Sequence, residues 1–276
     1  MNIIKFLDEF TTDQLQAPMS SRRAMFGQLG NISKKAAMLA VPFGLATMGN
    51  KAQAQSSSDV TAVLNLALTL EYLEDEFYDL ALQSGVLTTA KSQAIYAQIA
   101  KHESQHVTFL TSAIEAQGAT PVAKPTFDFT VGGAFDPFMN NANTTQATAY
   151  AQLLALAQAF EDTGVRAYKG QAANLIGNDA VLTAALQIHS VEARHASEIR
   201  RLRGLEGWIT GNQRGEGMPE ATQAVYNGEE NVTQGGVDVT TLGSGTPFSV
   251  DSSTQAYDEI LTGDQAVEIA SLFIVS

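Results

Sequence analysis

The sequence contains no cysteine, so neither disulfide bonds nor thiolate metal sites can form. Basic residues are also scarce, because 16 Lys and Arg stand against 29 Asp and Glu, and the formal net charge is −13. A nucleic-acid partner requires a basic surface, so we expect none. Nothing in the chain indicates a phosphate-binding glycine loop or a Ser-His-Asp arrangement.

Long hydrophobic runs are absent as well. The apolar run at 36–48 contains Pro42 and is too short and too broken for a membrane-spanning helix. It follows SRRAMF at 21–26, which resembles a twin-arginine export motif, and precedes AQA at 52–54, a typical cleavage site. We therefore predict that residues 1–54 are an export signal, and that the mature protein is periplasmic or secreted without stable membrane insertion. The alternative is an amphipathic N-terminal helix that stays with the folded protein.

Two Glu-x-x-His pairs stand out among the polar residues. One is Glu192 and His195, inside HSVEARH, and the other is Glu103 and His106, inside KHESQH. Residues three apart on an α-helix lie on the same face, so each carboxylate projects together with its imidazole. A buried carboxylate is costly unless it is paired or bound to a metal. One such pair is common by chance, but two pairs favour a metal site.

Each pair also follows another helical Glu in an apolar setting. Glu71 lies in TLEYLEDEFY and Glu161 lies in AFEDTGVRAY, at nearly equal distances before the two pairs. When these two segments are aligned, Tyr78 matches Tyr168. The sequence thus repeats one pattern, with Glu on a first helix and Glu-x-x-His on a second.

The repeated pattern supplies a ligand set for two metal ions, which we predict to be iron or manganese. Four carboxylates neutralise the charge of two divalent ions, and two neutral imidazoles suit both metals. The predicted ligands are Glu71, Glu103, His106, Glu161, Glu192 and His195. Both metals accept the same ligands, so the sequence does not choose between them.

Helical periodicity predicts an all-α bundle of four helices at about 58–82, 89–117, 145–169 and 178–203. We expect Phe109 and Leu110 on the inner side of the second helix, and we expect Gly170 to end the third. The segment 118–145 breaks the pattern but carries Phe side chains, so it should pack along the bundle as one long crossover between the second and third helices. A linker between two separate helix pairs is disfavoured, because neither pair could bury its apolar face alone.

Residues 206–276 are predicted to form a loop-rich extension that packs on the bundle or on a second subunit. Thr262 to Gln265 form a capping-box pattern that begins a short last helix. Arg200, Arg201 and Arg203 near the end of the fourth helix should complement its dipole as solvated side chains.

These motifs resemble those of the ferritin-like di-metal carboxylate superfamily. More narrowly, the chain is similar to the secreted ferritin-like-domain family that includes plant desiccation-related proteins. The resemblance implies a ferritin-like four-helix bundle, which we place at 55–205, and a metal pair that reacts with dioxygen or peroxide. The chain departs from the usual D/E-E-x-R-H motif because Val191 precedes Glu192. The first pair also lacks such an acid, so the carboxylate that would orient a ligand histidine is missing.

Five residues are candidates for groups that support the ligands: Glu74, Tyr78, His102, Tyr168 and Arg194. Glu74 lies one helical turn after Glu71 and is an alternative ligand. Tyr78 and Tyr168 are either functional groups beside the metal or ordinary packed tyrosines. His102 is expected at the surface or behind a ligand, and His189 is expected to be peripheral.

Two functions from different classes remain. In the first, the centre oxidises Fe(II) or consumes peroxide, so its partners are metal ions and small oxidants. In the second, the protein sequesters metal or acts structurally under stress such as desiccation. The long crossover and the C-terminal extension argue against a storage cage. A homodimer is the default expectation for the oligomer.

Overall fold

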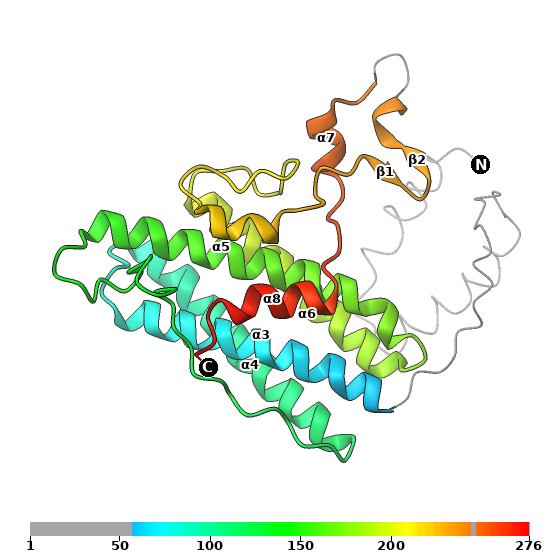
Figure 1. Cartoon of the computed structure of the whole chain (residues 1–276), viewed down its shortest axis with the longest axis horizontal. Helices are drawn as coiled ribbons and strands as arrows, with labels where there is room; N and C mark the ends of the chain where they lie inside the picture. Colours follow the sequence, from blue (N-terminus) through cyan, green and yellow to red (C-terminus); the bar gives the residue numbers. More distant parts are fainter. Residues whose placement is uncertain (1–56, 244–246, 276) are drawn as a thin grey trace, which may run out of the picture. The chain divides into compact units, whose positions relative to one another are not determined.

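The computed structural model describes residues 57–243 and 247–275. The predicted export signal, residues 1–54, lies outside the described residues. Four long helices form a bundle (Figure 1): α3 (Ser57–Gln83), α4 (Ala90–Ala116), α5 (Gln146–Gln171) and α6 (Asp179–Leu202). α3 packs against α4 and α5 packs against α6, while α3 also contacts α5 and α4 contacts α6. The predicted all-α four-helix fold is confirmed.

Polar side chains define where three of these helices begin. Thr89, Thr145 and Asn178 stand before α4, α5 and α6, and the side chain of each accepts a hydrogen bond from the backbone N–H three residues later. These bonds satisfy N–H groups that have no partner in the first turn of a helix.

α5 continues past Gly170, which corrects the prediction that this glycine ends the helix. The helix ends at Gln171 and is followed by the 3-10 helix η1 (Ala172–Leu175). Gly170 serves a different purpose, because a Cβ atom there would lie 1.9 Å from the backbone oxygen of Leu261. The missing side chain lets the C-terminal extension approach the backbone of α5.

The segment between α4 and α5 is the predicted long crossover. It begins beside the N-terminal half of α3, where the N–H of Val122 donates to the side chain of Asn65 at 2.8 Å. At its far end, Gln146 donates to the backbone oxygen of Val86 at 2.7 Å, just beyond the end of α3. The crossover therefore runs along the bundle, and α4 and α5 point in the same direction (Figure 1).

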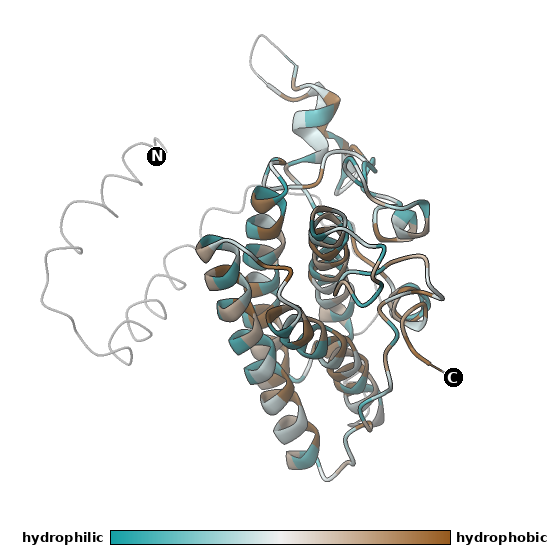
Figure 2. Ribbon diagram, turned by 90° about the vertical axis from the view of Figure 1, so that its left-hand side faces the viewer, coloured by the Kyte–Doolittle hydropathy of each residue, from teal (hydrophilic) through white to brown (hydrophobic). Residues whose placement is uncertain are grey.

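The two largest apolar clusters of the bundle lie on either side of a buried polar layer. In one cluster, Phe77 packs on Phe160 and on Phe129 of the crossover, with ring centroids 5.0 and 5.4 Å apart. The other cluster includes Leu110. Phe109, expected on the inner side of α4, is instead 42% exposed because it lies at the edge of that side. Hydrophobic and hydrophilic residues are mixed along every helix (Figure 2), and in the described part of the chain no helix is long and apolar enough to cross a membrane.

The C-terminal extension is built of short elements joined by loops. They are η2 (Glu220–Val225), β1 (Thr233–Gln234), β2 (Val237–Asp238), η3 (Val239–Thr241), α7 (Val250–Thr254) and α8 (Gly263–Ser271). β1 and β2 are antiparallel, with Thr233 opposite Asp238. α8 begins with the predicted capping box of Thr262 and Gln265. After α8, Phe273 packs on Phe160 with ring centroids 4.8 Å apart, so the extension packs on the bundle.

Arg166 of α5 anchors this extension. Its side chain is buried, and its Nε lies 2.7 Å from Oε1 of Glu229. The same guanidinium donates to four backbone carbonyl oxygens, two in residues 225–227 and two in residues 259–260. One side chain thus joins two separate stretches of the extension to the bundle.

Candidate metal centre

The four long helices bring the six predicted ligands to the buried polar layer in the middle of the bundle. We call these residues the Glu–His cluster: Glu71 from α3, Glu103 and His106 from α4, Glu161 from α5, and Glu192 and His195 from α6. All four glutamates are fully buried, His195 is buried, and His106 is partly exposed. The internal repeat of the sequence therefore corresponds to residues that meet in space.

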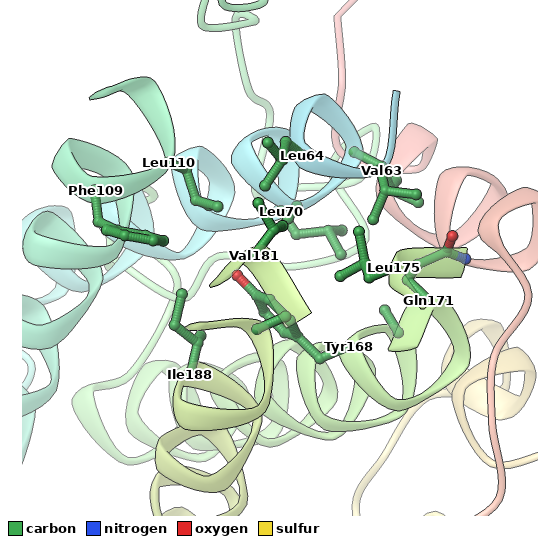
Figure 3. Close-up of a pocket in the computed structure, with 14 residues that line it drawn as sticks. Val63, Leu64, Leu70, Phe109, Leu110, Tyr168, Gln171, Leu175, Val181 and Ile188 are labelled. Carbon is green, nitrogen blue, oxygen red and sulfur yellow. The ribbon is translucent and has the colours of Figure 1, made fainter. Parts of the chain in front are cut away.

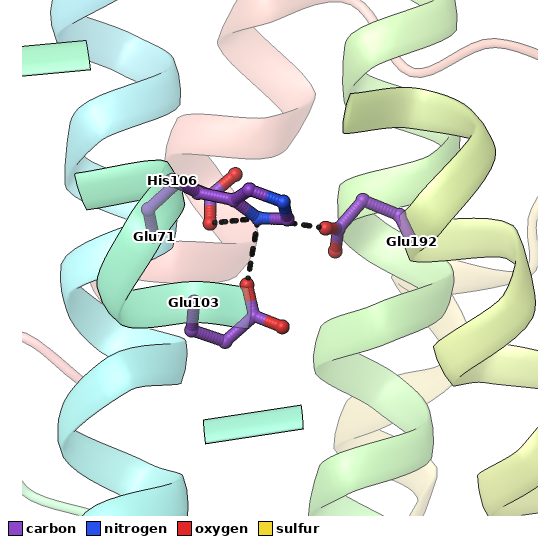
Figure 4. A group of neighbouring side chains, drawn as sticks. All are labelled: Glu71, Glu103, His106 and Glu192. Carbon is purple, nitrogen blue, oxygen red and sulfur yellow. Dashed lines mark hydrogen bonds and ion pairs between the residues drawn. The ribbon is translucent and has the colours of Figure 1, made fainter. Parts of the chain in front are cut away.

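The imidazole of His106 stands among three carboxylates (Figure 4). Its Nδ1 lies 3.1 Å from Oε2 of Glu71 and 3.1 Å from Oε2 of Glu103. The same nitrogen lies 3.3 Å from Oε1 of Glu192. Residues from α3, α4 and α6 thus converge on one point.

His195 has an equivalent position in the other half of the cluster. Its Nδ1 lies 2.9 Å from Oε1 of Glu103 and 3.2 Å from Oε2 of Glu161. Oε1 of Glu192 is 4.0 Å away. Both histidines therefore direct Nδ1 toward the carboxylates.

The cluster contains two overlapping groups of donor atoms. In each group, one ligand atom from every residue lies within 4.8 Å of the others. Glu103 and Glu192 belong to both groups. Glu71 and His106 belong only to the first group, and Glu161 and His195 belong only to the second. Two groups that share two carboxylates can hold two neighbouring ions, with the shared carboxylates between them.

Several buried donor atoms of the cluster have no hydrogen-bond partner within the described residues. They are Oε1 of Glu103, Oε2 of Glu161, both carboxylate oxygens of Glu192, and Nδ1 of His195. Nδ1 of His195 lies close to the oxygens of Glu103 and Glu161, but these atoms are not aligned for hydrogen bonds. Buried polar atoms are costly without partners, and carboxylate oxygens and imidazole nitrogens are donors that iron and manganese accept. The donor set therefore fits a metal pair.

In the absence of metal, burial favours the protonated, neutral form of several carboxyl groups of the cluster. Burial raises the pKa of Glu71 to about 8. It also raises the pKa of Glu192 well above the usual value, and the charge of Glu103 adds to this effect. Burial acts in the same direction on Glu103, but a hydrogen bond with His106 and the close ion pair with His195 outweigh it and lower the pKa of Glu103 to about 2.

The pKa values of the two histidines are shifted in the direction opposite to the effect of burial. Burial alone would lower the pKa of His106, but the nearby carboxylates, with Glu103 first, raise it to about 12. In the same way, the charge of Glu161 and the close ion pair with Glu103 outweigh burial and raise the pKa of His195 to about 11. In the metal-free protein, two imidazolium groups therefore supply positive charge where cations would bind.

The two aligned tyrosines hold the two unshared carboxylates in equivalent ways. The hydroxyl of Tyr168 donates to Oε1 of Glu71 at 2.5 Å. The hydroxyl of Tyr78 donates to Oε1 of Glu161. Both tyrosines are buried, and each orients one carboxylate of the cluster.

His102 lies behind His195, on the side away from the carboxylates. Its Nδ1 is 2.8 Å from Nε2 of His195. Its own Nε2 is 2.6 Å from Nε2 of Gln98, in an exposed contact. A histidine therefore stands in the position where a carboxylate usually orients a metal-binding imidazole.

Two other residues considered from the sequence lie apart from the cluster. Arg194 is exposed, and its guanidinium donates to the backbone oxygen of Ser190 at 2.9 Å. It does not reach the site that it was expected to support. His189 is peripheral, as expected, with Nδ1 3.0 Å from the backbone oxygen of Val165.

Glu74 is a further buried carboxylate beside the cluster. It belongs to neither donor group, so the geometry favours Glu71 as the donor from α3. Burial, together with the charges of Glu192 and Glu161, raises the pKa of Glu74 well above its usual value. Gly164 of α5 leaves room here, because a Cβ atom on it would lie 3.4 Å from Oε1 of Glu74 and 3.0 Å from Oε2 of Glu192.

Sequence reasoning missed a buried network next to Glu161. Arg200 was expected to be solvated, but it is only 4% exposed and pairs with Asp162. Oδ2 of Asp162 also accepts a hydrogen bond from Tyr226 at 2.8 Å. Arg200 is buried because the C-terminal extension, which carries Tyr226, covers this part of α6. In the sequence, the only local indication of this network is Asp162, an aspartate that follows Glu161 in an apolar helix.

A family model described as a ferritin-like domain matches residues 59–205, which is more than half of the chain. No curated protein matches the chain. The matched range includes all six residues of the Glu–His cluster and nearly the whole of the four long helices. The chain therefore belongs to the ferritin-like domain family.

Proposed function

We propose that the protein binds two iron or manganese ions in the Glu–His cluster. The observation that carries this proposal is the pair of donor groups that share Glu103 and Glu192. Glu71 and His106 complete one position, and Glu161 and His195 complete the other.

Charge and donor chemistry support this assignment. Four ionised carboxylates balance two divalent cations, and apolar clusters lie on both sides of the four buried glutamates. Oxygen and imidazole donors without sulfur suit iron or manganese. The cations would replace the two imidazolium protons and the protons on the buried carboxyl groups.

We further propose that the loaded centre is redox-active towards Fe(II), dioxygen or peroxide. A bound metal pair supplies Lewis acidity and electrons. The chain contributes a buried site that excludes bulk water and two tyrosine hydroxyls that hold Glu71 and Glu161 in place.

An anaerobic titration with Fe(II) or Mn(II), followed by elemental analysis, tests the metal site. The protein should bind two ions per chain. Glu192→Ala should weaken both positions, because Glu192 belongs to both donor groups. Arg194→Ala is the matched control on the same helix and should bind as the unchanged protein does. Failure to bind two ions, or unaltered binding by Glu192→Ala, would contradict the proposal.

Turnover by the loaded protein separates this function from a second candidate. That candidate is a metal-sequestering or structural stress protein of the desiccation-related kind. It is favoured by one observation, that His102 rather than a carboxylate supports His195. A protein that retains two ions yet neither oxidises Fe(II) nor consumes peroxide would have the second function.

We also propose that the protein is exported in folded form through the twin-arginine pathway, on the basis of SRRAMF at 21–26. Copper and zinc bind most nitrogen and oxygen sites more tightly than iron or manganese does. Loading before export would protect the site from these competitors. The double variant Arg22→Lys, Arg23→Lys should remain in the cytoplasm of its native host, as measured by cell fractionation.

A further inference from the structure

An apolar pocket lies between the four long helices at the end of the bundle where α3 begins and α4 ends (Figure 3). Among the 14 residues that line it, only Tyr168 and Gln171 carry polar side-chain atoms. The pocket leaves about 20 Å³ for the centre of a water-sized molecule. Its space therefore suits one very small molecule and not a chain or a ring.

The apolar pocket is adjacent to the Glu–His cluster on three helices. Ala67, Leu110 and Ile188 line the pocket. Each lies four residues from a member of the cluster on the same helix, namely Glu71, His106 and Glu192. Four residues correspond to about one helical turn, or about 5.4 Å along the axis.

Tyr168 joins the pocket to the cluster directly. Its side chain is part of the pocket wall, and its hydroxyl donates to Oε1 of Glu71 at 2.5 Å. Three other lining residues are in contact with solvent, because Phe109 is 42% exposed and Val63 and Val181 are partly exposed. The apolar lining thus extends from the surface to a side chain that contacts the cluster.

The chemistry of the lining selects the occupant. A buried water needs two to four polar partners, and the pocket offers only two polar side chains. Tyr168 already donates its hydroxyl hydrogen to Glu71, and the side-chain oxygen of Gln171 already accepts from Asn174. Peroxide has the same requirement, because both of its oxygen atoms donate and accept hydrogen bonds. Dioxygen has neither donor nor strong acceptor, and small apolar gases occupy dry apolar cavities.

We infer that this apolar pocket binds dioxygen and is its route from the surface to the metal centre. The inference rests on the proposed function, since it names the oxidant that reaches the Glu–His cluster through these residues. Peroxide, being polar, would reach the centre by another path.

Xenon binding tests the pocket without any need for metal or turnover. Crystals of the metal-free protein placed under xenon pressure should show a xenon atom among Leu110, Tyr168 and Ile188. Ala185, a small buried residue of the lining, offers a variant that fills the space. Ala185→Leu should lose the xenon peak, whereas Ala184→Leu, one residue along the same helix but outside the pocket, should keep it. No xenon in the unchanged protein would overturn the inference.

Kinetics of the metal-loaded protein provide the second measurement. In Ala185→Leu, the ratio of the dioxygen-driven to the peroxide-driven oxidation rate should fall by about tenfold. Ala184→Leu should leave this ratio unchanged. A ratio that does not fall in Ala185→Leu, while the xenon site is lost, would show that dioxygen takes another route.

The two proposals fail in distinguishable ways. If the protein binds no metal but takes up xenon in the pocket, the proposed function is wrong and the pocket keeps its preference for small apolar gases. If it binds two ions and the dioxygen ratio is insensitive to Ala185→Leu, the metal site stands and the route is wrong. Thermal unfolding of each variant establishes that it is folded, and the xenon result on the unchanged protein does not depend on any variant.

Discussion

Nε2 of His195 lies 2.8 Å from Nδ1 of His102, while Nδ1 of His195 faces Glu103 and Glu161. The two rings meet edge to edge and are nearly coplanar, with an interplanar angle of 15° and centroids 5.1 Å apart. His102 thus fixes the ring plane of an imidazole whose other nitrogen points into the Glu–His cluster. The neighbour of a metal-binding histidine determines the orientation and basicity of its ring.

His102→Ala should weaken metal binding by about 10- to 100-fold, the usual effect of removing the group behind a ligand histidine. A competition titration with a coloured chelator measures this change. Arg194→Ala removes a side chain that does not contact the cluster, so its affinity should equal that of the unchanged protein. Equal affinities in all three proteins would mean that His102 does not support the site.

Metal binding should strengthen as the pH rises from about 6 to about 9, because ligands bind metal in their deprotonated form. Without metal, the pKa values of His106 and His195 are raised to about 12 and about 11, and that of Glu71 to about 8. These groups carry protons at pH 7 that the metal must displace. Calorimetry in buffers of different ionisation enthalpy should detect proton release on binding; an affinity independent of pH would contradict this expectation.

The metal-free protein should lose stability over the same range. The folded-state pKa of Glu71 lies above its ordinary value of 4.5, and those of His106 and His195 lie above 6.5. The folded protein therefore binds more protons than the unfolded chain, and stability falls as pH rises. The loss from Glu71 extends from pH 4.5 to about 8, and the loss from the histidines begins at 6.5 and continues to about 11 or 12. Urea unfolding at pH 6 and pH 9 measures the difference, and added Mn(II) should reverse its sign.

Gly164→Ala should reduce metal affinity without a comparable loss of folding stability. The added Cβ atom would lie 3.0 Å from Oε2 of Glu192, so that carboxylate must move. Alanine is favoured over glycine within a helix by about 1 kcal/mol, which offsets part of the crowding. Metal titration and urea unfolding of the same variant separate the two effects. Unaltered metal affinity would show that the carboxylate has room to adjust.

Arg166→Met should destabilise the protein by about 3–5 kcal/mol, because it leaves the buried Glu229 without its partner. The double variant with Glu229→Gln should recover part of this loss, since no unpaired charge then remains. Arg201→Met, at an exposed position on α6, is the control and should change stability little. Urea unfolding measures all three variants, and a single variant as stable as the control would show that Arg166 does not anchor the extension.

Local signals in the sequence predicted the elements that depend on neighbouring residues. Apolar periodicity located the four helices to within a few residues, since a helix presents side chains three and four apart on one face. The sequence pairs Glu71 with the first Glu-x-x-His motif and Glu161 with the second. This repeat predicted the residues that meet in the buried layer. The capping box at Thr262 located α8, because capping involves only residues of one turn.

The tertiary structure decided the features that depend on distant segments. The sequence predicts that Gly170 ends a helix, but in the structure Gly170 contacts Leu261, which lies far along the chain. Arg200 reads as a solvated helix terminus, but the extension that carries Tyr226 buries it against Asp162. The choice of Glu71 over Glu74 likewise depends on which carboxylate faces α4 and α6.

The sequence by itself therefore determined the helices, their order and the set of residues directed to the interior. These follow from the spacing of residues along a single helix. Only the packing of the four helices and the extension decided which donor groups overlap, where His102 meets His195, and where an apolar pocket remains beside Tyr168. Such contacts depend on distances between backbones that lie far apart in the chain, and no local pattern records them.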